Sequence, residues 1–190
     1  MDSIVRSSAA KINLFLEVLG KRPDGYHEVL TWLHEIDLSD HITVARTDLE
    51  HCTLRTRDTT IPFGNRNLCI KAYNAFCEAT GLDEKVEISL DKSIPLGSGL
   101  AGGSSNAASV IVAMNELFDV GLPDDRLREI AATVGADTPF FISGGSAVAT
   151  GRGTEISPLP RFEPSVWIVV AKPEPAVSTG DAYKWIKKHR

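Results

Sequence analysis

The sequence lacks a metal-like cysteine pattern, a long hydrophobic run and an excess of basic residues. Its three cysteines (Cys52, Cys69 and Cys77) are odd in number and irregularly spaced, and no secretory signal is visible, so we expect reduced thiols in a cytoplasmic protein. The apolar run at 166–171, VWIVVA, is far too short to span a bilayer. These absences argue against a disulfide-rich protein, a protein whose cysteines bind a metal ion, and a membrane-spanning protein.

Basic charge is also scarce, because 20 Lys and Arg face 25 Asp and Glu for a net charge of −5. No broad basic surface is then expected to displace counterions from nucleic acid, which argues against general nucleic-acid binding. A phosphorylated small molecule needs only a local positive site and stays open as a ligand. With 43% hydrophobic and 24% charged residues over 190 positions, the chain can bury one large core or two small ones.

Hydrophobic periodicity outlines the secondary structure. Alternation predicts a strand at 10–19 with Lys11 and Asn13 side by side on one face. The other face is expected to carry Ile12, Leu14, Leu16 and Val18. Further strands are expected at 29–38, 41–45, 86–90, 146–150 and 166–171, and helices at 67–80, 104–118, 123–135 and 181–190. Strands dominate the first third and helices the middle, so we predict an α+β fold.

Residues 95–106, PLGSGLAGGSSN, form a stretch with much backbone and little side chain. Glycine lets a ligand approach the chain closely, and free N–H groups at a helix start suit an anion, most often phosphate. An ordinary glycine loop without a ligand is the alternative. The G-x-G-x-x-G spacing also matches a dinucleotide site, but no strand runs directly into it, and a Walker loop would need lysine at Gly103.

Three motifs in order carry a resemblance to a known family. PLGSGLAGGSSNAA resembles the phosphate-binding motif of the galactokinase, homoserine kinase, mevalonate kinase and phosphomevalonate kinase (GHMP) superfamily. AKINLFLEVLGKRPDGYHEVLT (10–31) and GADTPFFISGGSAVATGRGTEISPL (135–159) resemble the members that act on a cytidine diphosphate-linked methylerythritol. The resemblance implies ATP-dependent phosphorylation of the 2-hydroxyl of 4-(cytidine 5'-diphospho)-2-C-methyl-D-erythritol, with Mg²⁺, in isoprenoid precursor biosynthesis by the methylerythritol phosphate pathway.

The resemblance also implies catalytic roles. Asp137 matches the family's catalytic aspartate, which acts as a base or orients the hydroxyl, and Lys11 matches a lysine near the same hydroxyl. A lysine there would keep Asp137 ionised and offset developing negative charge. Asn13 shares the strand face and can hydrogen-bond the substrate. From the residues alone, without the resemblance, Asp137 is more often a turn or helix-cap residue, and a solvated strand lysine is the favoured interpretation of Lys11.

Binding residues follow from the same match. Those expected at the cytidine-containing substrate are Tyr26, His27, Thr179 and Tyr183. Those expected at ATP are Asn67, Lys92, Pro95, Gly97, Ser98, Gly99, Leu100, Ala101, Gly102, Gly103, Ser104 and Ser105, with Leu68 near the adenine. Ser104 is also the candidate Mg²⁺ ligand. Lys92 and Leu68 read equally as a surface lysine and a helix core residue.

Domain boundaries are expected at the end of the chain. Residues 1–172 are predicted to form the ATP- and substrate-binding domain, and 173–190 a pocket segment and the start of a linker to the family's C-terminal domain. Because that domain does not follow Arg190 in this sequence, self-association through the surface it would cover is expected. The sequence also departs from the family pattern at Ala9, where the family usually has proline. The alternative functions are an ATP-binding form without turnover and another GHMP small-molecule kinase.

Overall fold

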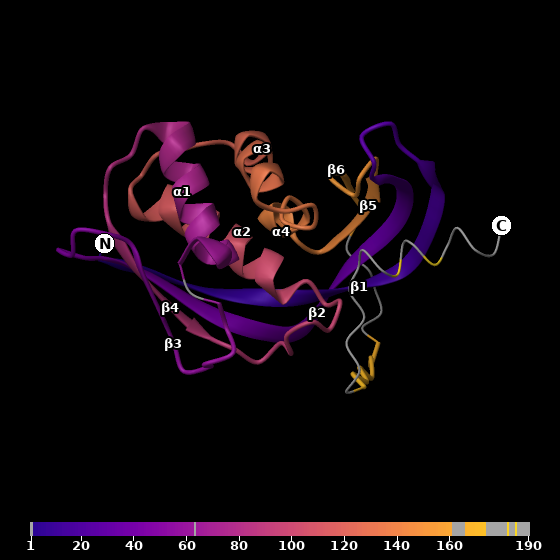
Figure 1. The fold of residues 1–190 in the computed structure, drawn as a ribbon, viewed down its shortest axis with the longest axis horizontal. Helices are drawn as coiled ribbons and strands as arrows, with labels where there is room; N and C mark the ends of the chain where they lie inside the picture. Colours follow the sequence, from indigo (N-terminus) through magenta and orange to yellow (C-terminus); the bar gives the residue numbers. More distant parts are fainter. Residues whose placement is uncertain (1, 63, 161–165, 174–181, 183–184, 186–190) are drawn as a thin grey trace.

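The computed structural model describes residues 2–62, 64–160, 166–173, 182 and 185. Figure 1 shows a curved sheet with helices packed on one face. The strands are β1 Ser3–Lys21, β2 His27–Arg46, β3 Thr53–Thr56, β4 Val86–Asp91, β5 Ser146–Thr150 and β6 Glu155–Pro158; the helices are the 3-10 turn Gly64–Arg66, α1 Leu68–Thr80, α2 Gly102–Leu117, α3 Asp124–Val134 and α4 Phe140–Ser143. The α+β prediction is confirmed.

The sheet has six strands in the order β3-β4-β2-β5-β6, and β1 pairs with β2 off this path. β3 and β4 are parallel, whereas the other pairs are antiparallel. The separate strands predicted at 29–38 and 41–45 are one continuous strand, β2. A register shift in its pairing with β1, between Ala9 and Ala10, accommodates the polar stretch around Asp40 without ending the strand.

A bulge in β1 corrects the predicted faces of that strand. The pairing with β2 shifts register between Asn13 and Phe15. An extra residue in one strand reverses which face the following side chains take. Leu16 and Val18 therefore line the same cavity as Lys11, where strict alternation placed them on the opposite face.

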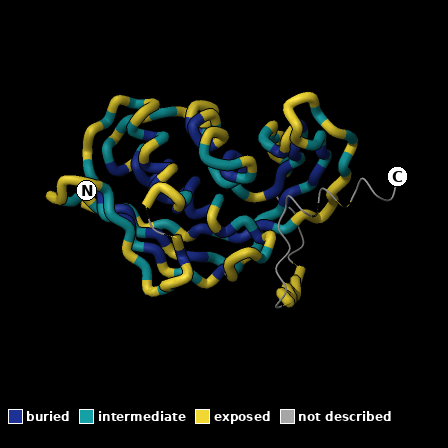
Figure 2. The backbone as a smooth tube through the Cα atoms, in the orientation of Figure 1, coloured by how far each residue is buried: buried dark blue, intermediate teal, exposed yellow. Residues whose placement is uncertain are grey.

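The three long helices lie where capping residues predict them. α1 begins after Asn67, whose Oδ1 accepts a hydrogen bond from Cys69 N, and ends at Gly81 in the left-handed conformation (φ 73°). α3 lies between Pro123 and Gly135. α2 begins two residues earlier than predicted, inside the glycine stretch. Figure 2 shows their buried faces turned toward the sheet, and fully buried side chains there include Phe76, Ile88, Ile111 and Met114.

The predicted strand at 166–171 is wrong. Residues 166–173 have no regular secondary structure, and Trp167 and Val169 are exposed. A β-branched run becomes a strand only when a neighbour completes its backbone hydrogen bonds, and no described strand pairs with this one. The predicted helix at 181–190 lies almost entirely outside the described residues. Within the described residues, no helix is long and apolar enough to cross a membrane.

Candidate active site

One cavity of about 560 Å³ lies where the first strands meet the glycine loop. Cavities of this size accommodate small-molecule ligands. Eleven of the residues that the sequence predicts at the site line it: Lys11, Asn13, Lys92, Pro95, Gly97, Ser98, Gly99, Ala101, Gly102, Gly103 and Asp137. Residues more than 100 positions apart in the sequence therefore share one cavity.

Lys11 and Asp137 face each other in this cavity. The side chain of Lys11 is only 8% exposed, and its Nζ lies 3.9 Å from Asp137 Oδ2. The Asp137 carboxylate, which is 42% exposed, remains open to a ligand. The pair places a cation and an available carboxylate side by side, an arrangement suited to holding a hydroxyl group that must lose a proton.

Asn13 is held in place by a short chain of hydrogen bonds. Lys11 Nζ donates to Asn13 Oδ1 at 2.8 Å, and Asn13 Nδ2 donates to Thr31 Oγ1 at 2.7 Å. Thr31 Oγ1 in turn donates to the carbonyl of Phe15, on the far side of the bulge, at 2.7 Å. The bulge and β2 thus fix the orientation of both Asn13 and the lysine beside it.

The glycine loop adopts the conformations that its glycines allow. Gly97 and Gly99 have φ values of 63° and 75°, and Ala101 has φ 56°, which is uncommon for a residue with a side chain. Lys11 N donates to the Leu100 carbonyl at 3.0 Å, so the loop is tied to β1 next to the catalytic candidates. α2 begins directly afterwards at Gly102. The backbone N–H groups of its first turn point out of the N-terminal end of the helix, and this end lies at the cavity.

A buried aspartate that sequence reasoning missed supports this loop. Asp40 is fully buried and forms an ion pair with Lys92. Its Oδ1 accepts hydrogen bonds from the backbone N–H groups of Ser93 and Ile94 at 2.7 and 2.8 Å, and its Oδ2 accepts one from Asn106 Nδ2 at 3.1 Å. One carboxylate therefore joins β2, the segment before the glycine loop and helix α2.

A signal for Asp40 exists in the sequence. Residue 40 has the same alternation phase in β2 as the buried Ile42 and Val44, so a charged residue stands on the apolar face. A carboxylate on a buried face requires partners. The alternation could have marked it as the centre of a polar network.

Some predicted residues do not line the cavity. Asn67 is buried and its side-chain atoms are engaged, as the cap of α1 and as donor to the Pro62 carbonyl at 2.9 Å. Leu68 lies near Gly103, where an added Cβ would be 3.3 Å from its Cδ1. The predicted residues Leu100, Ser104 and Ser105 do not line the cavity either.

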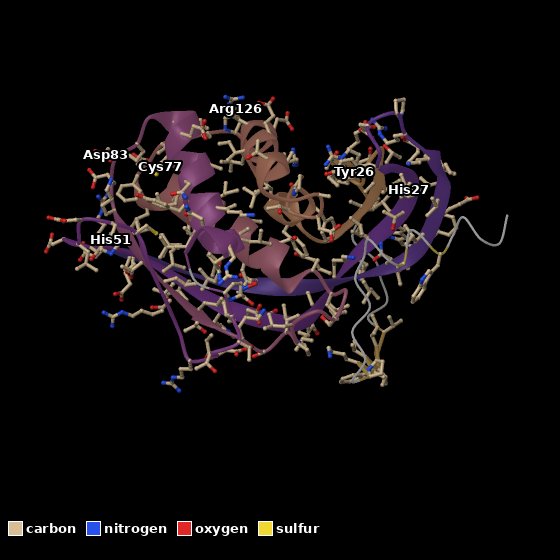
Figure 3. All side chains as sticks on the ribbon, in the orientation of Figure 1. Tyr26, His27, His51, Cys77, Asp83 and Arg126 are labelled. Atoms are coloured by element: carbon tan, nitrogen blue, oxygen red, sulfur yellow. The ribbon has the colours of Figure 1, made fainter. Side chains whose placement is uncertain are left out.

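The predicted base-recognition residues lie at the turn between β1 and β2. Figure 3 shows Tyr26 and His27 beside β5 and β6, at the opposite end of the molecule from the labelled His51, Cys77 and Asp83. The guanidinium of Arg152 lies 3.6 Å from the centroid of the Tyr26 ring, which is 52% exposed. Arg152, which sequence reasoning missed, lines the cavity, whereas Tyr26 and His27 do not. Thr179 and Tyr183 lie outside the described residues.

The cysteines play no part in this cavity. All three are free thiols, and burial raises the pKa of Cys52 and of Cys69 to about 12. Burial also raises the pKa of Cys77. At neutral pH these groups are thiols and not thiolates, so none is a nucleophile. Among residues 2–62, 64–160 and 166–173, no cluster of three His, Cys, Asp or Glu could hold a metal ion.

The fold and the cavity define a class of protein. Residues 67–145 match the family of "GHMP kinases N terminal domain". A solved homoserine kinase from Cytophaga hutchinsonii shares the fold with a TM-score of 0.70 at 20% identity, covering 97% of this chain and 60% of that one. With its glycine loop at a helix start, the chain has the fold of the N-terminal domain of the GHMP kinases and is similar to them in sequence.

Among the proteins similar to this chain, those that are more identical to it in sequence share one name. The chain is 41% identical to the 4-diphosphocytidyl-2-C-methyl-D-erythritol kinase of Gloeobacter violaceus, covering 99% of this chain and 62% of that protein. The kinase of the same name from Bacillus cereus is also 41% identical, and the match covers 95% of this chain and 62% of that protein. A crystal structure of 4-(cytidine 5'-diphospho)-2C-methyl-D-erythritol kinase is 38% identical with a TM-score of 0.69, covering 82% and 55%. The chain thus spans about three fifths of the length of these relatives.

Proposed function

We propose that this chain is the ATP- and substrate-binding part of a kinase that phosphorylates the 2-hydroxyl of 4-(cytidine 5'-diphospho)-2-C-methyl-D-erythritol. The observation that carries the proposal is the shared cavity, in which Lys11 and Asp137, 3.9 Å apart, stand beside the glycine loop. A phosphate site next to a cation–carboxylate pair is the arrangement that phosphoryl transfer to an alcohol requires. The similarity to kinases named for this substrate supports the choice of acceptor.

In the proposed reaction, the oxygen of the acceptor hydroxyl forms a bond to the γ-phosphorus of ATP while the bond from that phosphorus to the β-γ bridging oxygen breaks, releasing ADP. Asp137 orients the hydroxyl and accepts its proton. Lys11, held by Asn13, offsets the negative charge that develops on the transferring group. The N–H groups of the loop and of the first turn of α2 hold the nucleotide phosphates.

Mg²⁺ is proposed to enter with the nucleotide. Asp137 is the one carboxylate among the described residues that line the cavity, so the protein offers few ligands of its own. Magnesium in such sites is usually bound by one or two protein oxygens together with substrate phosphates. We propose the Asp137 carboxylate and the hydroxyl of Ser104, in the first turn of α2, as the protein ligands. The ion would supply charge neutralisation at the phosphates.

The acceptor's cytidine is assigned to the end of the cavity near the turn between β1 and β2. Tyr26 and His27 lie beside this end of the cavity without lining it. Tyr26 is proposed to offer a ring face for base stacking and His27 to offer hydrogen bonds, while Thr179 and Tyr183 are proposed to complete the pocket. Residues 1–172 form the binding domain in this proposal and 173–190 its pocket segment. We place the reaction in isoprenoid precursor synthesis in the cytoplasm, following the resemblance to kinases of this route.

The test is release of ADP with three acceptors: the cytidine diphosphate-linked methylerythritol, mevalonate and homoserine. We expect ADP release above the acceptor-free rate only with the first. Preference for mevalonate or homoserine would contradict the proposed acceptor but would still agree with a GHMP kinase that acts on another acceptor. ATP binding with no acceptor-dependent release from any of the three would contradict the proposed activity.

A further inference from the structure

The charges around the cavity are unevenly balanced. Among the described residues, the charged side chains that line it are Lys11, Lys92, Arg152 and Asp137. Lys92 forms an ion pair with the buried Asp40, and Lys11 lies 3.9 Å from Asp137. No carboxylate in the described part of the chain lies within ion-pair distance of Arg152. Among the described residues, Arg152 is therefore the cavity cation without a carboxylate at ion-pair distance, although Asp24 on the turn between β1 and β2 interacts with it electrostatically.

The turn that carries Arg152 is firmly attached to β2. The Gly151 carbonyl accepts a hydrogen bond from Val29 N at 2.9 Å, and Gly151 N donates to Glu28 Oε1 at 3.1 Å. Gly153 N donates to the Thr150 carbonyl at 2.9 Å and closes the turn between β5 and β6. The backbone under Arg152 is thus held at two places, so little ordering is needed when a ligand binds.

The ring of Tyr26 orients the guanidinium. The guanidinium carbon of Arg152, Cζ, lies over this ring, 3.6 Å from the ring centroid. Stacking on an aromatic face leaves the N–H donors at the edge of the guanidinium plane available. A guanidinium fixed in this way matches the oxygens of a phosphate with two parallel hydrogen bonds.

Arg152 stands at the end of the cavity remote from the glycine loop. The loop is tied to β1 at Lys11, whereas Gly153 lies near Val29, which pairs with Val18 of β1. The seven residue steps from Lys11 to Val18 correspond to about 23 Å of extended strand. The phosphates of the nucleotide held by the loop and an anion held by Arg152 would therefore belong to different ligands.

We infer that Arg152 binds a phosphate group of the acceptor substrate and so selects acceptors that carry a diphosphate. The inference rests on the proposed function, because it takes the loop to hold ATP and the opposite end to hold the acceptor. It gives Tyr26 a second role, as the support of Arg152, beside the proposed stacking on the base with its other face. In this inference, nucleotide binding at the glycine loop does not depend on Arg152.

The test is calorimetric titration of the full chain with cytidine 5'-diphosphate and, separately, with ATP. Arg152→Gln should weaken cytidine diphosphate binding by about tenfold or more, since a bidentate charged contact is lost. Arg152→Lys keeps the charge but not the fork and should lose less. ATP affinity should stay unchanged in both. The dependence of cytidine diphosphate affinity on salt should also be smaller in Arg152→Gln than in the wild type.

Arg126→Gln is the matched control, because Arg126 is an exposed arginine of α3 that pairs with Glu129 and does not line the cavity. Its affinities should equal those of the wild type. Unchanged cytidine diphosphate affinity in Arg152→Gln would overturn the inference and leave the proposed function intact. An equal loss of ATP affinity would overturn it as well, by showing a general defect. A wild-type protein that binds ATP but no cytidine diphosphate would contradict both proposals.

Discussion

At the scale of single residues, the arrangement of Lys11 and Asp137 depends on the different surroundings of the two side chains. Lys11 is almost fully buried and anchored by Asn13, so its charge is fixed in position. Asp137 is partly exposed and can turn toward a ligand. In the proposed reaction, the fixed cation of Lys11 suits charge stabilisation and the accessible carboxylate of Asp137 suits proton transfer.

Asp137→Asn tests that assignment. The amide keeps the shape of the side chain but cannot accept a proton, so turnover should fall by about 10²-fold or more while ATP affinity is retained. Asp91→Asn, at the exposed end of β4 and outside the cavity, is the control and should match the wild type. The measurements are ADP release with the cytidine diphosphate substrate and titration with ATP. Wild-type turnover in Asp137→Asn would remove the residue from catalysis.

At the scale of elements, the buried carboxylate of Asp40 couples β2 to the glycine loop and to α2. Removing one partner of a buried ion pair leaves the other charge uncompensated. Asp40→Asn should therefore lower the free energy of unfolding by about 3 kcal/mol, because Lys92 is only 8% exposed. Urea denaturation followed by circular dichroism measures this loss.

Two further variants sharpen that prediction. Asp37→Asn, an exposed position in the same strand, should leave the urea midpoint unchanged. The double variant Asp40→Asn/Lys92→Met removes both charges and should recover part of the lost stability. An Asp40→Asn protein as stable as the wild type would show that the network does not stabilise the loop.

The long helices and most strands could be predicted because their signals are local. Asn67 and Gly81 mark the ends of α1, and Pro123 and Gly135 mark the ends of α3. Lys11, Asp137 and the glycine loop were also singled out from the sequence, through motifs that each occupy a short stretch of it. The structure adds that these motifs share a cavity.

The remaining features depend on contacts between distant parts of the chain. The β1 bulge is a property of its pairing with β2, so alternation within β1 alone misplaced Leu16 and Val18. Asp40 acquires its partners from residues more than fifty positions away. Arg152 enters the site only because the β5–β6 turn packs beside β2. The alternation in β2 marks Asp40 as a buried charge, but no local signal identifies the partners in any of these contacts.

At the scale of the whole molecule, large apolar side chains remain exposed. Leu14, Phe15 and Leu19 of β1 are 45–52% exposed, and Trp167 is fully exposed. Exposed apolar clusters of this kind promote association. We predict that this chain self-associates with rising concentration in sedimentation velocity runs, and that Phe15→Ser weakens the association.

The control for that prediction is Leu49→Ser, since Leu49 is 45% exposed but lies after β2, away from the exposed part of β1. It should associate as the wild type does. A wild type that stays monodisperse and monomeric at high concentration would contradict the prediction.

The whole account depends on the glycine loop holding nucleotide phosphates at the cavity that β1, β2 and α2 build together. Gly103 is the position at which to test this. At Gly102 an added Cβ would lie 2.9 Å from Ile94 Cγ2 and 3.1 Å from Lys92 Nζ, whereas at Gly103 the nearest atom is the flexible Cδ1 of Leu68 at 3.3 Å. Gly103→Val therefore places bulk at the phosphates with little strain on the fold. Gly20→Val, where a Cβ meets nothing within 4 Å, is the matched control.

The decisive measurement is calorimetric titration of the wild type, Gly103→Val and Gly20→Val with ATP. We predict that Gly103→Val loses ATP affinity by about tenfold or more, because the valine side chain keeps phosphate oxygens from the backbone N–H groups. Gly20→Val should bind ATP as the wild type does. Equal ATP affinity in all three proteins would contradict the account, since the loop would then be a structural turn and the cavity would lack its nucleotide site.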